Sequence, residues 1–159
     1  MFAPVAMLAK MPSATCYFNP NGELLLHPAE LAESLAHAER HDLPPIDAWS
    51  NVRMFGIDAA WTMMDTVGLA QLDEPDHEAW FRRARYEPAA VARWLRNVSL
   101  YVHGGTKIED GHTADGPGGI KWRASACGEA ATAPPRDVLR WAPDDGGTPP
   151  WLPPPSPVH

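Results

Sequence analysis

Two strand-like segments separated by a very short link constrain the fold of this chain most strongly. WSNVRMFGID (49–58) and WTMMDTVGL (61–69) are rich in residues that favour strands, and their apolar side chains recur at every second position. The link Asp58-Ala59-Ala60 can join such strands only as an antiparallel hairpin, because parallel strands need a crossover of a dozen or more residues. The sequence therefore predicts a central hairpin of 49–58 and 61–74.

The clearest helix is predicted over 88–103, where apolar residues follow helical spacing between Pro88 and the stop signal Gly104-Gly105. Further helices are expected at 1–11 and 28–41, strands at 14–18, 23–26, 119–127 and 137–141, and a loop or short helix at 76–86. Together these elements predict an α+β fold, an antiparallel β-sheet with two to three helices packed on one face. Helices 28–41 and 88–103 are expected to cover the sheet.

The length and composition indicate one domain followed by a tail. The chain has 159 residues, of which 45% are apolar, enough for a core without disulfide staples. We predict a single domain over 1–141 and a proline-rich tail over 142–159, polyproline-like or disordered, whose Trp151 and Leu152 pack back onto the domain. Reduced cysteines in the cytoplasm are the expectation, although the sequence leaves open whether Cys16 and Cys127 pair.

The charge of the chain restricts its partners. The net charge is -7, which argues against nucleic acid as a partner because phosphate neutralisation needs clustered basic residues. No apolar stretch is long enough to span a membrane. An acidic surface fits a basic protein partner, and some of the seven tryptophans could line a recognition surface rather than the core.

A loop rich in glycine and acidic residues, 104–119, follows the long helix. Its turn dipeptides Asp110-Gly111 and Asp115-Gly116 favour a structural role. A partner-binding loop is the second interpretation. A divalent-metal site is a weaker alternative, and its ligands would be His103, Asp110, His112 and Asp115.

A second acidic run lies at the end of the predicted hairpin. It is either an ordinary strand end that faces water or a docking patch for a basic partner. The predicted partner-binding residues of the two segments are Asp73, Glu74, Asp76, Glu78, Glu109, Asp110 and Asp115. No catalytic residue and no cofactor is predicted, since the sequence lacks the common phosphate-binding, nucleophile-elbow and zinc motifs. Cys127 is interpreted as an inert thiol rather than a nucleophile.

Three segments between Leu43 and Gly116 resemble one family in their order. They are LPPIDAW (43–49), MDTVGLAQLDEPD (64–76) and WLRNVSLYVHGGTKIEDGHTADG (94–116). They resemble domain-of-unknown-function family 4261, an uncharacterised and mainly bacterial family. His112 departs from the family's usual Asp, and Ala70 and Gln71 replace a Gly and a Glu. The resemblance implies a fold and carries no reaction.

Two hypotheses of function follow from these observations. The first is a non-enzymatic protein-binding domain, in its most concrete form a bacterial immunity protein that binds and neutralises a cognate toxin. It rests on the acidic charge, the small size, the tryptophan content and the absent catalytic motifs. The alternative is a small metal-dependent or hydrolytic enzyme that uses the 103–115 cluster of His, Asp and Glu.

Overall fold

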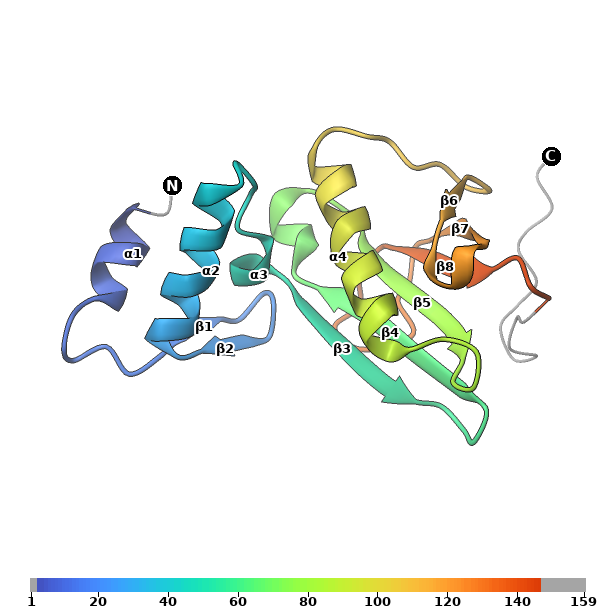
Figure 1. Ribbon diagram of the computed structural model, residues 1–159, viewed down its shortest axis with the longest axis horizontal. Helices are drawn as coiled ribbons and strands as arrows, with labels where there is room; N and C mark the ends of the chain where they lie inside the picture. Colours follow the sequence, from blue (N-terminus) through green and yellow to red (C-terminus); the bar gives the residue numbers. More distant parts are fainter. Residues whose placement is uncertain (1–2, 147–159) are drawn as a thin grey trace.

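A computed structural model describes residues 3–146, which form two adjoining parts (Figure 1). The N-terminal lobe, residues 3–45, contains α1 (Ala3–Ala9), the antiparallel pair β1 (Tyr17–Asn19) and β2 (Leu24–Leu26), and α2 (Pro28–Arg40). The short α3 (Ile46–Trp49) leads into the second part, the sheet body. The sheet body contains β3 (Asn51–Gly56), β4 (Trp61–Val67), η1 (Leu69–Leu72), β5 (Asp76–Arg82), α4 (Pro88–His103), β6 (Thr113–Asp115), η2 (Pro117–Gly119), β7 (Lys121–Cys127) and β8 (Val138–Pro143).

The six strands of the sheet body form one mixed sheet in the order β3-β4-β5-β8-β7-β6. The α+β class and the central β3–β4 hairpin are confirmed. The sheet is not purely antiparallel, because β5 and β8 pair in parallel with Asp76 opposite Val138. The chain leaves β5, passes through α4 and returns through the β6–β7 pair. β8 therefore enters beside β5 in the same direction, which is the crossover that a parallel pair requires.

The prediction of a loop or short helix at 76–86 is wrong for its first half. Residues 76–82 form β5, the third strand of the sheet, and its first six residues are buried. The polar start of this strand, Asp76-His77-Glu78, resembles a solvent-exposed turn in sequence. Only ionic partners brought in from distant segments make its burial favourable, and one sequence stretch does not reveal them.

The long helix α4 packs on one face of the sheet, as expected. Its buried residues Val91, Leu95 and Val98 join a core that includes Phe81 and Trp141. Helix α2 does not cover the sheet as predicted, because it lies beside α1 in the N-terminal lobe (Figure 1). Its start and end agree with the prediction. His27 and Glu30 form a capping box that satisfies backbone N–H groups at the N-terminus.

Both central strands are shorter than predicted. Residues 46–49 form α3, so β3 begins at Asn51 rather than Trp49. β4 ends at Val67, because Gly68 adopts a φ of 119° and starts the single turn η1. A left-handed backbone of this kind favours glycine and ends the strand.

The last strand runs further than predicted, whereas β7 begins at Lys121 rather than residue 119. β8 runs to Pro143, two residues into the predicted tail, because Ala142 and Pro143 pair with Arg123 and Trp122 of β7. Residues 113–115 of the glycine-rich loop form β6 at the edge of the sheet. The predicted packing of Trp151 and Leu152 concerns residues outside the described range. Among residues 3–146, no helix has the length and apolar character needed to cross a membrane.

Candidate functional site

The predicted partner-binding acids divide into buried and exposed groups. Asp76 and Glu78 are fully buried, so they do not face water as the sequence suggested. Glu74 is half-buried and lies 2.7 Å from Nδ1 of His103. The acids that remain exposed are Asp73, Glu109, Asp110 and Asp115. The acidic run at 73–78 is therefore divided, with its last two acids inside the protein.

Buried Glu78 belongs to a row of polar residues that crosses the sheet on the face opposite α4. Strand register places Arg53 beside Asp65, Asp65 beside Glu78, and Glu78 beside Arg140. Their neighbours Met64 and Ala79 point to the other face, where they join the α4 core. Alternation along strands explains this division, since successive side chains point to opposite faces. We call these four residues the charged row.

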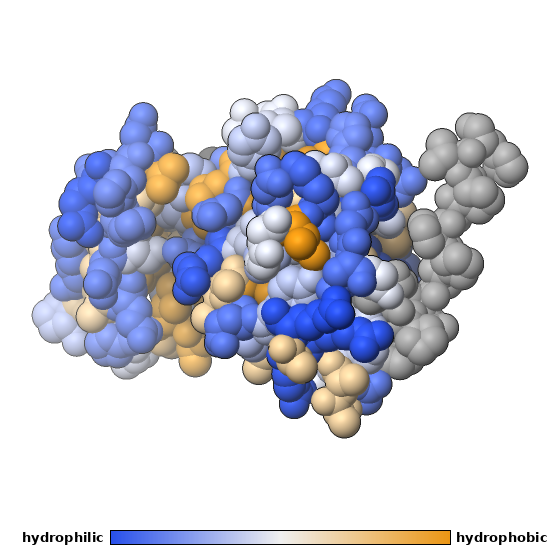
Figure 2. All heavy atoms as spheres, turned by 45° about the vertical axis from the view of Figure 1, so that its right-hand side comes forward, coloured by the Kyte–Doolittle hydropathy of each residue, from blue (hydrophilic) through white to orange (hydrophobic). Residues whose placement is uncertain are grey.

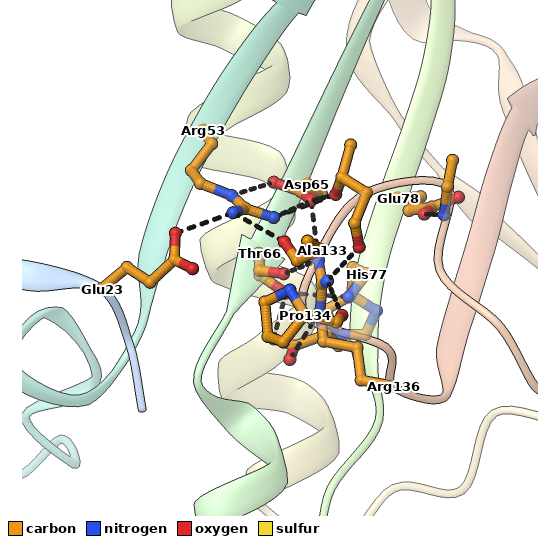
Figure 3. Close-up of polar contacts among 12 residues, drawn as sticks. Glu23, Arg53, Asp65, Thr66, His77, Glu78, Ala133, Pro134 and Arg136 are labelled. Carbon is orange, nitrogen blue, oxygen red and sulfur yellow. Dashed lines mark hydrogen bonds and ion pairs between the residues drawn. The ribbon is translucent and has the colours of Figure 1, made fainter. Parts of the chain in front are cut away.

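Each acid of the charged row is paired with arginine at short distance (Figure 3). Arg53 binds Asp65 with two hydrogen bonds, of 3.0 Å from Nε and 2.6 Å from Nη2, and reaches Glu23 of the N-terminal lobe at 2.8 Å. The pKa of Arg53 is raised, chiefly by its hydrogen bond to Asp65. Arg140 Nε donates to Glu78 at 2.8 Å. Bidentate and charge-assisted contacts of this kind make burial of a carboxylate tolerable.

The β7–β8 connection, residues 128–137, covers the charged row and completes its pairing. Arg136 donates through Nη2 to Asp65 and to the carbonyl of Thr66, and through Nη1 to the carbonyls of Thr132 and Pro134. Its Nε lies 3.2 Å from Asp76. The side chain of Arg136 is 5% exposed, and its hydrogen bonds join the connection to the sheet. Three buried acids and three arginines therefore balance in charge across this face.

Two titratable groups at the start of β5 have shifted pKa values. The pKa of Asp76 is raised because burial disfavours its charged form, although hydrogen bonds from Thr66, Leu69 and Gly68 oppose the shift. The pKa of His77 is lowered to about 3, because the ring is completely buried on the α4 side. Trp141 Nε1 donates to His77 Nδ1 at 3.4 Å. His77 is therefore a neutral core residue at pH 7.

The side chains proposed as metal ligands make contacts with other residues of the protein. Asp110 accepts a hydrogen bond from the backbone N–H of Ala126, and His112 accepts one from the N–H of Glu109. Asp115 pairs with Lys121 at 2.7 Å. Within residues 3–146, no group of three or more His, Cys, Asp or Glu side chains could hold a metal ion. His112 therefore caps a turn, whereas Asp110 and Asp115 contact residues of β7, and His103, at the end of α4, lies beside Glu74.

The two cysteines are both free thiols. Cys16 is exposed in the N-terminal lobe, whereas Cys127 is half-buried at the end of β7. Burial is the main cause that raises the pKa of the Cys127 thiol. A raised pKa disfavours the thiolate, the form that a nucleophile requires, and supports the interpretation of Cys127 as inert.

Sequence reasoning missed an apolar surface on the N-terminal lobe. Its members are apolar residues at least half exposed to solvent: Met7 72%, Leu8 60%, Met11 51%, Phe18 62% and Leu25 65%. We call these five residues the apolar patch. In sequence they are ordinary core candidates of a short helix and a hairpin. Only the small size of the lobe, which offers too little surface to cover them, leaves them exposed.

The fold and these sites define an α+β domain with a mixed sheet, one face packed on a long helix and the other sealed over a balanced ionic network. Residues 65–142 match the family model described as domain of unknown function (DUF4261), which confirms the resemblance to this family. The match runs from β4 into β8, so it includes Asp65, Glu78, Arg136 and Arg140. It does not include the N-terminal lobe. No curated protein and no solved structure gives a match to the chain.

Proposed function

We propose that this chain is a non-enzymatic protein-binding domain that captures a basic protein on its N-terminal lobe, in its most concrete form an immunity protein that neutralises a cognate toxin. The apolar patch is the observation that carries the proposal. Single exposed apolar side chains are common, but a gathered set marks an interaction surface. Figure 2 shows that hydrophilic residues cover most of the surface over the sheet body, with larger hydrophobic areas toward the N-terminal lobe.

The members of the apolar patch lie close together. Phe18 and Leu25 are directly opposite each other in the β1–β2 pair, so their side chains point to the same face. Leu8 and Phe18 line one groove of about 260 Å³, whose floor includes Leu31. Met7 and Met11 flank Leu8 along the chain. Leu8, Phe18 and Leu25 therefore offer a partner an apolar contact with a recess.

The net charge of the N-terminal lobe favours a basic partner. The N-terminal lobe carries five acidic residues, Glu23, Glu30, Glu33, Glu39 and Asp42, against the two basic residues Lys10 and Arg40, a net charge of −3. A polar rim around an apolar centre is the usual anatomy of a transient interface. An acidic rim speeds association with a basic protein and repels acidic proteins.

The exposed acids of the sheet body add to this attraction in the proposal. Asp73, Glu109, Asp110 and Asp115 are accessible, and their field extends over about 8–10 Å at physiological salt. They contribute to the approach of a basic toxin rather than to its final contacts. The 103–115 cluster does not favour the enzymatic alternative, since His103 contacts Glu74 while Asp110, His112 and Asp115 contact other residues.

The proposal is tested by binding to the proteins encoded next to this chain's gene. A basic product should form a complex, lose affinity as salt is raised, and lose its toxic activity when bound. The double variant Phe18→Ser/Leu25→Ser should weaken the complex by more than about tenfold, since such anchors each contribute at least about 1 kcal/mol. Met54→Ser is the matched control, because Met54 is also apolar and 59% exposed but lies on β3.

The two variants decide the outcome together. Both substitutions lie on exposed side chains, so neither is expected to change the melting temperature by more than a few degrees. Equal binding by the double variant and the wild type would show that the apolar patch is not the interface. An equal loss of affinity in Met54→Ser would also show that the apolar patch is not the interface.

A further inference from the structure

The segment 106–115 runs from the end of α4 to β6 (Figure 1). A pocket of about 640 Å³ lies between this segment and α4. This volume falls within the range of sites that hold small molecules. The pocket is on the face opposite the charged row and away from the N-terminal lobe. All of its lining residues lie inside the stretch 65–142 that matches the family.

Aromatic rings form the floor and one wall of the pocket. Trp141 is 1% exposed at the floor, and Trp94 packs edge-on against it with ring centroids 5.1 Å apart. Trp94 Nε1 donates to the carbonyl of Asp115 at 2.9 Å, which fixes the orientation of its ring. Tyr101 lies seven residues after Trp94, about two turns further along α4, and is 65% exposed. Trp94 and Trp141 present fixed aromatic surfaces to a planar ligand, and the exposed ring of Tyr101 adds a third.

The charged rim of the pocket is basic in an otherwise acidic protein. Two of the three lysines in the chain, Lys107 and Lys121, lie on it. Lys121 is neutralised by Asp115 at 2.7 Å, and Asp115 is the only carboxylate among the lining residues. Lys107 has no ionic partner among residues 3–146, so its ammonium group is free to bind an anion.

We propose that this pocket binds a small aromatic molecule that carries one anionic group, with the ring against Trp94 and Tyr101 and the anion at Lys107. Aromatic rings attract one another beyond the effect of their buried area, which favours a ring over an aliphatic chain. A carboxylate or a phosphate would satisfy Lys107 equally. The proposed ligand site is independent of the protein-binding function, because it shares no residue with the apolar patch.

Three probes with the same ring and different charge test the proposal. Indole-3-acetate, indole and tryptamine are titrated into ¹⁵N-labelled protein, and the Trp94 indole N–H and the Tyr101 and Lys107 amide signals are followed. Indole-3-acetate should bind about tenfold more tightly than tryptamine, because one ion pair replaces one repulsion. Phenyl phosphate, tested in the same way, distinguishes a phosphate from a carboxylate preference.

Two variants separate the ring contact from the charge contact. Lys107→Gln should reduce the preference for indole-3-acetate over tryptamine to about threefold or less, whereas Lys10→Gln, in the N-terminal lobe, should leave it unchanged. Tyr101→Ala should weaken all three probes and Tyr101→Phe should not. Tighter binding of tryptamine, shifts confined to residues outside the pocket, or no shift at millimolar concentrations would each overturn the proposal.

Discussion

At the scale of single residues, burial changes the chemistry of groups that look alike in the sequence. Asp73 and Asp76 are three positions apart, yet Asp73 is exposed while Asp76 lies inside the protein against Arg136. His77 and His112 differ in the same way, because His77 is sealed between strand and helix and His112 caps an exposed turn. The role of each group follows from what surrounds it and not from its type.

His77 predicts how stability depends on pH. Its pKa is lowered from 6.5 to about 3 in the folded protein, so the unfolded chain binds a proton between these values and the folded chain does not. The free energy of unfolding should therefore fall as the pH falls, by about 1.4 kcal/mol for each unit between pH 6.5 and 3 from this residue. The contribution of Asp76 to this pH dependence has the opposite sign, because its raised pKa makes the folded state bind a proton at a higher pH than the unfolded chain does.

Comparison of variants isolates the contribution of His77. His77→Gln keeps a side-chain oxygen that can accept from Trp141 Nε1 and has no proton to gain. Urea unfolding at pH 7, 6, 5 and 4.5 gives the free energy of unfolding, which should fall less steeply with falling pH for this variant. The difference between the two slopes should correspond to close to one proton. His37→Gln, on the exposed side of α2, should retain the wild-type slope. A His77→Gln slope equal to that of the wild type would contradict the assignment.

At the scale of elements, the β7–β8 connection is as much a part of the sheet as the strands are. It brings Arg136 over β4 and β5 and places the backbone N–H of Ala131 on Glu78. Without this cover, Asp65 and Glu78 would be carboxylates on an open sheet face. The connection and the charged row therefore depend on each other for stability.

Arg136→Lys tests this dependence because it keeps the charge and removes the planar fork. Lysine cannot donate at once to Asp65, Thr66 and the two carbonyls of the connection, so stability should drop by about 2–4 kcal/mol. Hydrogen exchange in a peptide over 129–137 should rise more than in β4. Arg93→Lys, on an exposed position of α4, should change neither quantity. Unchanged exchange over 129–137 would show that Arg136 does not hold the connection.

The elements also show how far the sequence alone could predict this fold. The β3–β4 hairpin, α2 and α4 were predicted from local patterns, since capping residues and apolar spacing are local signals. β5 was missed because its polar start becomes favourable only beside Arg136 and Arg140, which lie about sixty residues further on. The parallel β5–β8 pair was missed for the same reason. Among the candidate sites, the exposed acids were predictable, whereas the apolar patch depends on how little of the lobe is covered.

At the scale of the whole molecule, the N-terminal lobe is docked on the sheet body through a polar joint around Asn19 and through the ion pair of Glu23 with Arg53. Asn19 donates to the carbonyls of Ala48 and Trp49 and to Gln71, and Gln71 in turn donates to Trp49. The backbone of Gly22 sits directly against this joint. The matched stretch 65–142 supplies the sheet body except β3 and the first residues of β4, and the lobe is the part of this chain that carries the proposed interface.

Gly22→Ala tests whether the lobe can separate from the sheet body. A Cβ at this position would lie 2.4 Å from the carbonyl oxygen of Trp49, and backbone cannot give way as a flexible side chain does. The lobe should be displaced, at a cost of about 1–3 kcal/mol, and amide exchange should rise in β1, β2 and α2 while β4 and β5 keep their protection. Gly128→Ala is the matched control, because its Cβ would meet no atom closer than 3.9 Å. If Gly22→Ala raised exchange in lobe and sheet alike, the two parts would form one cooperative unit. If instead the lobe alone loosened, the lobe could move without loss of the fold of the sheet body.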